Sequence, residues 1–169
     1  MTAENVGQRF DRLPPTAAER SVPGRATRAE VLAYFAERFG IDRGTFEDYT
    51  FWEKGAGRIW VFSADVPSPV SVEAVGMTCL RTRQEHWKPT TDAMQRFGHA
   101  ATRNVIELDD ASARRFVAGE DQALEWDGDW GYLLAVHEIA GRREPLGVGR
   151  YLHGELQSMV PKGRRRTVG

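Results

Sequence analysis

Positively charged residues gather at the end of the chain, where their side chains are suited to binding phosphate. A turn is predicted there because Pro161 and Gly163 interrupt the run. The planar guanidinium of arginine donates two parallel hydrogen bonds to a phosphate group. With Arg150 on the preceding predicted strand, we expect the tail to bind the phosphate backbone of RNA; the alternative is a solvated chain end. The tail cations are Lys162, Arg164, Arg165 and Arg166.

A second basic cluster surrounds a tryptophan near the middle of the chain. A tryptophan ring can stack on an unpaired base, which contributes about 1–3 kcal/mol, while neighbouring cations bind the backbone. The alternative is a tryptophan buried beneath a charged loop, and the sequence leaves both open. The residues proposed to bind RNA here are Arg81, Arg83, Trp87 and Lys88.

Catalytic chemistry is not indicated by the residue spacing. The four histidines have no HxH or HExxH spacing, and a single cysteine, Cys79, provides no zinc-knuckle pattern. The glycines Gly147 and Gly149 lack the third glycine of a dinucleotide-binding loop. We therefore expect no enzyme activity, no cofactor and no metal.

The charge distribution supports a polyanion as the ligand. The 169 residues carry a formal net charge of −1, but residues 104–130 are mainly acidic and the chain from residue 142 onward is mainly basic. Such asymmetry is typical of polyanion binding at one end. Acidic residues 120–129, with Trp126 and Trp130, leave an alternative open: an adaptor that binds a basic protein.

Composition predicts a globular protein of the cytoplasm. The chain is 41% hydrophobic and 28% charged, and no apolar run approaches the ~20 residues of a membrane helix. No secretion signal is expected from the N-terminal sequence. A lone cysteine cannot form an internal disulfide, which fits a reducing compartment.

The first half of the chain predicts an α/β domain over residues 27–101. Residues 1–26, with several prolines, predict an extended or poorly ordered arm. Thr27 and Glu30 form a capping box before a helix that Gly40 ends. The remaining predicted elements are a hairpin over 49–63, a strand over 72–80 and a short helix that starts at 89–92.

The second half, residues 102–169, predicts a small barrel with a basic tail. Gly119 ends a helix that Asp109 or Asp110 begins. The other predicted elements are strands at 104–108 and 131–139 and a closing pair of strands joined at His153–Gly154.

This second half resembles a PUA domain, the small RNA-binding barrel named after pseudouridine synthases and archaeosine transglycosylases. The resemblance covers residues 102–166. It is carried by the order and spacing of Val105-Ile106, the helix end Arg115-Phe116-Val117-Ala118-Gly119, the strand from Gly131, and Pro145-Leu146-Gly147-Val148-Gly149. The resemblance implies structural roles for Gly119, Gly147 and Gly149.

Two protein families share parts of this arrangement. Residues 75–80, followed by a helix and the PUA pattern, are similar to Nip-type ribosome-biogenesis factors, in which a pre-PUA domain precedes a PUA domain. Residues 160–165 resemble the C-terminal PUA-like domain of Sun-family RNA cytosine-C5 methyltransferases. The whole chain is most similar to uncharacterised archaeal proteins grouped with these families. No Pro-Pro-Cys motif is present, so methyltransferase activity is not expected.

The sequence thus predicts an α+β protein with a pre-PUA-like α/β domain followed by a PUA β-barrel. The predicted function is non-catalytic recognition of structured rRNA or tRNA, in ribosome biogenesis, rRNA processing or RNA modification. A precursor ribosome or an RNA-modification enzyme is the predicted partner, with no membrane and no DNA. The alternatives are the adaptor and a subunit associated with an RNA-modifying enzyme.

Overall fold

The computed structural model describes residues 8–72 and 74–165, which form parts of two compact units. The first unit comprises Met1–Glu37 and Asp42–Lys88, and the second comprises Arg38–Ile41 and Pro89–Gly169. The sequence predicts a division near residue 101, whereas the units divide after Lys88. The helix between these two positions groups with the second unit because it packs against a strand of that unit.

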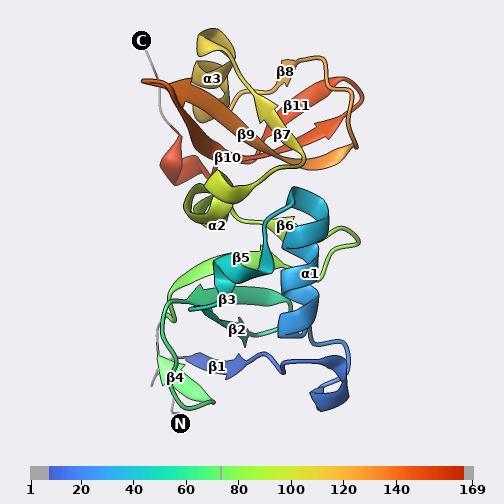
Figure 1. Cartoon of the computed structure of the whole chain (residues 1–169), viewed down its shortest axis with the longest axis vertical. Helices are drawn as coiled ribbons and strands as arrows, with labels where there is room; N and C mark the ends of the chain where they lie inside the picture. Colours follow the sequence, from blue (N-terminus) through green and yellow to red (C-terminus); the bar gives the residue numbers. More distant parts are fainter. Residues whose placement is uncertain (1–7, 73, 166–169) are drawn as a thin grey trace. The chain divides into compact units, whose positions relative to one another are not determined.

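A six-stranded sheet forms the first unit, in the order β4-β1-β2-β3-β5-β6 (Figure 1). Neighbouring strands from β4 to β5 are antiparallel. Its strands are β1 (Gln8–Arg12), β2 (Thr50–Lys54), β3 (Arg58–Phe62), β4 (Val70–Val72), β5 (Met77–Arg81) and β6 (Lys88–Pro89). The helical segments are η1 (Ala17–Glu19), α1 (Arg28–Phe39) and η2 (Arg43–Phe46).

The start of α1 is the predicted capping box. The Thr27 hydroxyl accepts a hydrogen bond from the Glu30 amide at 3.1 Å, and the Glu30 carboxylate accepts one from the Thr27 amide at 3.0 Å. Phe35 and Phe39 are fully buried on one face of the helix. Gly40 follows the helix with φ of 66°, a conformation that favours glycine.

The hairpin β2–β3 is central in its sheet, as its alternating apolar residues predict. On one face Phe51 contacts the buried Phe46, which in turn contacts Phe35 of α1. On the other face Trp52 and Phe10 belong to a second apolar cluster. Both faces are therefore covered by apolar side chains.

Part of the predicted N-terminal arm is a strand. Within residues 1–26, β1 pairs with β2 and β4, and Phe10 on β1 is fully buried. The pairing confirms the extended alternative for this part of the arm. Residues 1–7 lie outside the described part of the chain.

The second unit contains a five-stranded mixed sheet, in the order β7-β9-β10-β11-β8. The β7–β9 pair is parallel and the other pairs are antiparallel. Its strands are β7 (Val105–Glu107), β8 (Gln122–Ala123), β9 (Gly131–Ile139), β10 (Arg142–Leu152) and β11 (Glu155–Ser158). Its helical segments are α2 (Thr91–Phe97), η3 (Gly98–Ala100), α3 (Asp110–Val117) and η4 (Lys162–Arg164).

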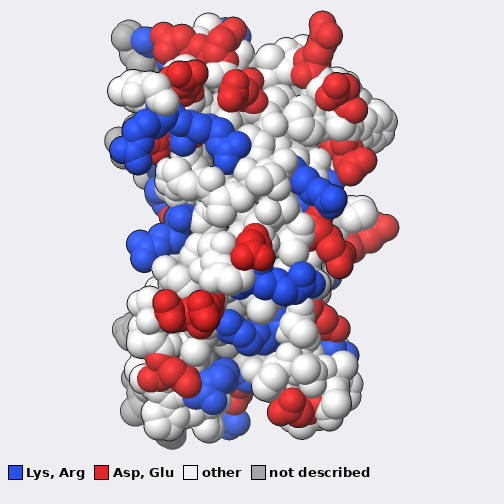
Figure 2. Space-filling view, viewed as in Figure 1, with Lys and Arg blue, Asp and Glu red and all other residues white. Residues whose placement is uncertain are grey.

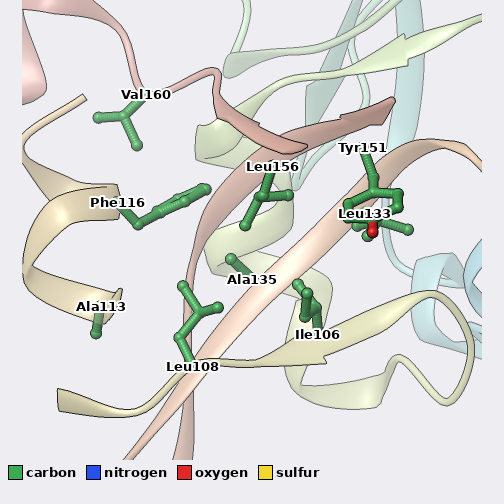
Figure 3. Packing of buried hydrophobic residues seen from close by; sticks show 9 residues of the cluster. All are labelled: Ile106, Leu108, Ala113, Phe116, Leu133, Ala135, Tyr151, Leu156 and Val160. Carbon is green, nitrogen blue, oxygen red and sulfur yellow. The ribbon is translucent and has the colours of Figure 1, made fainter. Parts of the chain in front are cut away.

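Apolar side chains from α3 and the strands form the core of this unit. Phe116 points from α3 toward Leu156 of β11 (Figure 3). Leu133 and Ala135 of β9 lie in the same cluster. The opposite face of the β9–β10 pair carries α2, where the Thr91 hydroxyl accepts a hydrogen bond from the Val148 amide. The sheet thus has one face toward α3 and the other toward α2.

Two local features support the predicted boundaries in this unit. Asp109 caps α3 by accepting a 2.8 Å hydrogen bond from the Ser112 amide, and this bond lowers the pKa of Asp109. His153 and Gly154 join β10 to β11 with φ of 53° and 80°, both positive as in a type I′ hairpin turn.

None of the helices in the described part of the chain has the length and apolar character that a membrane span requires.

Candidate nucleic-acid interface

The predicted RNA-binding tail leaves the core of the second unit at Val160. This side chain is buried, and the segment is fixed by the Met159 amide, which donates to the Val148 carbonyl at 2.9 Å. The next residues form η4, with Lys162, Arg164 and Arg165 exposed. Arg166 lies outside the described residues.

Arg164 is bound to α2. Its guanidinium forms an ion pair with Asp92 and donates a 2.6 Å hydrogen bond to the Gln95 side chain. The ion pair offsets the charge of Arg164 and attaches η4 to the helix. The sequence predicts that Arg164 binds phosphate directly, and that role stays a prediction beside this pairing with α2.

Arg165 lies across the end of α3. Its Nε donates to the Val160 carbonyl at 3.1 Å. A Cβ added to Gly119 would lie 2.3 Å from that nitrogen, so the absence of a side chain at Gly119 provides the space for Arg165. Gly119 also has φ of 87°, which glycine adopts without strain.

Arg150 projects from β10 on the side of the sheet that carries α2. It lies opposite Tyr132 of β9 and Gln157 of β11, two residues from the buried Val148 on the same face. Its side chain is exposed. Arg150 thus projects from the side of the sheet that carries α2, the helix to which Arg164 is bound.

Within the described residues, Arg150 and Lys162 are exposed cations without an ion pair. In the space-filling view, Lys and Arg side chains gather over η4 and the adjoining strands (Figure 2). Asp and Glu side chains gather instead over α3 and the loop after β8. The charge asymmetry of the sequence is therefore also present on the surface of this unit.

The glycines of the PUA-like motif lie at close contacts along β10. Gly147 follows an irregularity in the β9–β10 register and lies against Thr91 of α2. A Cβ at Gly149 would lie 2.7 Å from Leu156 and 3.1 Å from Phe116. Gly149 therefore allows α3 and β11 to pack closely on β10.

The structure places the residues of the predicted cluster around Trp87 in different surroundings. The Trp87 ring is half-buried with its centroid 5.7 Å from that of Tyr34, so burial accounts for part of its surface. Lys88 begins β6. Arg81 ends β5 directly opposite Arg58, a residue that sequence reasoning did not select.

The acidic loop lines a hollow of about 1050 Å³ in the second unit. Its lining includes Glu125, Trp126, Asp127 and Tyr151. Trp130 beyond this loop is 57% exposed. In the alternative prediction of a protein-binding adaptor, this hollow and Trp130 are the surface that would bind a partner.

Cys79, the one cysteine of the sequence, has no access to solvent. Its thiol is fully buried in β5, and burial raises its pKa. A nucleophilic cysteine reacts as the thiolate, which burial in apolar surroundings disfavours. Across residues 8–72 and 74–165, no group of three or more His, Cys, Asp or Glu side chains is placed to hold a metal.

Comparison with known proteins assigns the second half of the chain. Residues 103–166 match the family model described as the methyltransferase RsmF PUA domain. The second unit carries a PUA domain of this type. This confirms the predicted PUA domain, which was expected over residues 102–166, and the predicted resemblance to the PUA-like domain of Sun-family methyltransferases. Residues 1–76 match a family of unknown function (DUF7122).

A curated relative supports the same assignment. The ribosomal RNA small subunit methyltransferase F of Aeromonas salmonicida (strain A449) is 24% identical over 107 residues. The matched segment is 62% of this chain and 22% of that protein. The chain therefore spans about a fifth of the length of this relative. The archaeal relationship and the tRNA role predicted from the sequence find no support in these matches, and the Nip-type resemblance stays a prediction.

Proposed function

We propose that this protein binds structured ribosomal RNA through its PUA domain and has no catalytic activity of its own. The observation that carries the proposal is the PUA match over residues 103–166, within which Arg150 and Lys162 are exposed and without an ion pair among the described residues. A role in ribosome biogenesis or rRNA modification, alongside a separate enzyme, fits a relative that is a ribosomal RNA methyltransferase.

Recognition in this proposal depends on phosphate contacts and RNA shape. Arg150 and Lys162 provide charges for the backbone, and Arg165 adds a third at the end of α3. Arg164 holds η4 against Asp92, so it orders the segment that carries Lys162. Contacts of this kind fix the position of an RNA helix or junction without reading its sequence.

The salt dependence of RNA binding tests the proposal. About three phosphate contacts predict a slope of about −2 for log affinity against log salt at the single-strand value, and each lost contact reduces it by about 0.7. We expect Arg150→Gln to weaken rRNA binding and flatten the slope. Arg142→Gln is the matched control because Arg142 is also an exposed arginine on β10. Equal slopes for both variants would contradict the proposal.

An adaptor function is the second candidate, favoured by the hollow beside Glu125 and Asp127. Carboxylates with an adjacent tryptophan suit a basic segment of a partner protein. Ribonuclease treatment separates the two functions. A partner lost on treatment is held through RNA, whereas one retained until Glu125 and Asp127 are neutralised is held by the adaptor surface.

A further inference from the structure

Three cations of the first unit are aligned across neighbouring strands. Lys54 of β2 lies opposite Arg58 of β3, and Arg58 lies opposite Arg81 of β5. Directly opposed residues in antiparallel strands project from the same face, with Cβ atoms about 4.5–5.5 Å apart. We call Lys54, Arg58 and Arg81 the cation row.

The charges of the cation row are not balanced by carboxylates. None of the three residues forms an ion pair among the described residues, and Arg58 and Arg81 are exposed. The nearby Glu53 is buried, where its carboxylate accepts hydrogen bonds from Arg25 and the Gly57 amide. Asp11 likewise pairs with Arg9. Like charges placed directly opposite destabilise a sheet, so the row favours an anionic ligand.

The surface around the row is concave and partly aromatic. A hollow of about 420 Å³ is lined by Arg9, Lys54, Gly55, Ala56 and Arg58. The Lys54 amino group lies 5.6 Å from the centroid of the Trp60 ring, which is half-buried. A cationic groove beside an aromatic ring is the combination with which many proteins bind single-stranded nucleic acid.

We propose that the cation row is a second RNA-binding site that holds the backbone of a single-stranded segment. The inference rests on the proposed function in one respect. Because the same chain carries a PUA domain proposed to bind RNA, RNA is the polyanion that we expect the row to bind. Two adjacent, unpaired arginines match the charge of successive phosphates. The row adds contacts that neither the PUA match nor the basic tail supplies.

The test uses the full chain and an oligouridine as the single-stranded probe, with affinity measured over a range of salt. We expect Arg58→Gln to weaken binding several-fold and reduce the salt slope by about 0.7, and Arg58→Gln with Arg81→Gln to reduce it about twice as much. Arg58→Lys keeps the charge and should restore the slope. Arg43→Gln is the matched control, because Arg43 is another exposed arginine of the first unit without an ion pair among the described residues.

The outcomes separate this inference from the PUA proposal. If Arg58→Gln and the double variant behave like Arg43→Gln with oligouridine while Arg150→Gln weakens the binding of structured ribosomal RNA, the cation row is not a site and the PUA proposal stands. If Arg58→Gln weakens oligouridine binding while Arg150→Gln leaves the binding of structured ribosomal RNA unchanged, the row is a site and the PUA proposal fails. Equal loss with inorganic polyphosphate and oligouridine would also overturn the inference, because the row would then bind any polyanion.

Discussion

At the scale of single residues, identical side chains in the basic tail have different roles. Arg164 is paired with Asp92, and Arg165 is bonded to the Val160 carbonyl. The sequence shows that these residues are arginines near a turn, and the structure confirms that turn. The sequence alone does not reveal that Asp92 is the partner of Arg164, because the two residues are 72 positions apart in the chain. Charge counting therefore leaves out the contacts that tail cations make within the protein.

Gly149 offers a test of close packing in the PUA domain. We expect Gly149→Ala to lower the free energy of unfolding by about 1–3 kcal/mol, because the added methyl group overlaps Leu156 and Phe116. Gly163→Ala is the control, since nothing lies within 4 Å of a Cβ there. Urea denaturation measures both variants. Equal stabilities would show that β11 and α3 move apart at little cost.

At the scale of elements, regular periodicity is what the sequence predicts well. The capping box of α1, the β2–β3 hairpin and the cap of α3 at Asp109 all lie where local patterns place them. The cation row was missed because it depends on strand register. Lys54 and Arg58 flank a hairpin turn, but the strand order that adds Arg81 is not written in any local segment.

The cation row predicts a conflict between stability and binding. We expect Arg58→Gln to raise the free energy of unfolding by about 0.2–1 kcal/mol in the absence of RNA, because repulsion from Lys54 and Arg81 is relieved. The gain should shrink in 1 M salt, where the screening length is about 3 Å. Thermal unfolding at low and high salt measures it. A loss of stability at low salt would mean that Arg58 has a favourable partner.

At the scale of the whole molecule, the domain type of the second half could be predicted from the sequence, whereas the extent of the first domain could not. The order of strand, helix and glycine-marked strands from Val105 to Gly149 is characteristic enough to assign, and the family match confirms it. The predicted boundary near residue 101 places α2 in the first domain. The sequence of this helix shows that one face is apolar, but not which unit that face packs against. Its packing on β10 is a tertiary contact, so the division after Lys88 was not predictable.

The proposal of a non-catalytic protein makes a prediction for the intact chain. We expect no transfer of a methyl group from S-adenosylmethionine to ribosomal RNA; transfer to carbon 5 of cytosine requires a thiolate nucleophile, and the one thiol, Cys79, is buried with a raised pKa. A radiolabelled methyl donor measures the transfer. Incorporation that disappears in Cys79→Ala would contradict the proposal, and so would incorporation by pure protein that persists in that variant, because methyl transfer to a nitrogen or oxygen atom needs no thiol.

The burial of Cys79 also has a practical consequence for spectroscopy. Because that thiol is fully buried, a cysteine introduced at the exposed Gly163 would be the preferred target for a maleimide dye without removal of the native residue. A fluorophore there would lie between Lys162 and Arg164. Its emission would report RNA arriving at η4.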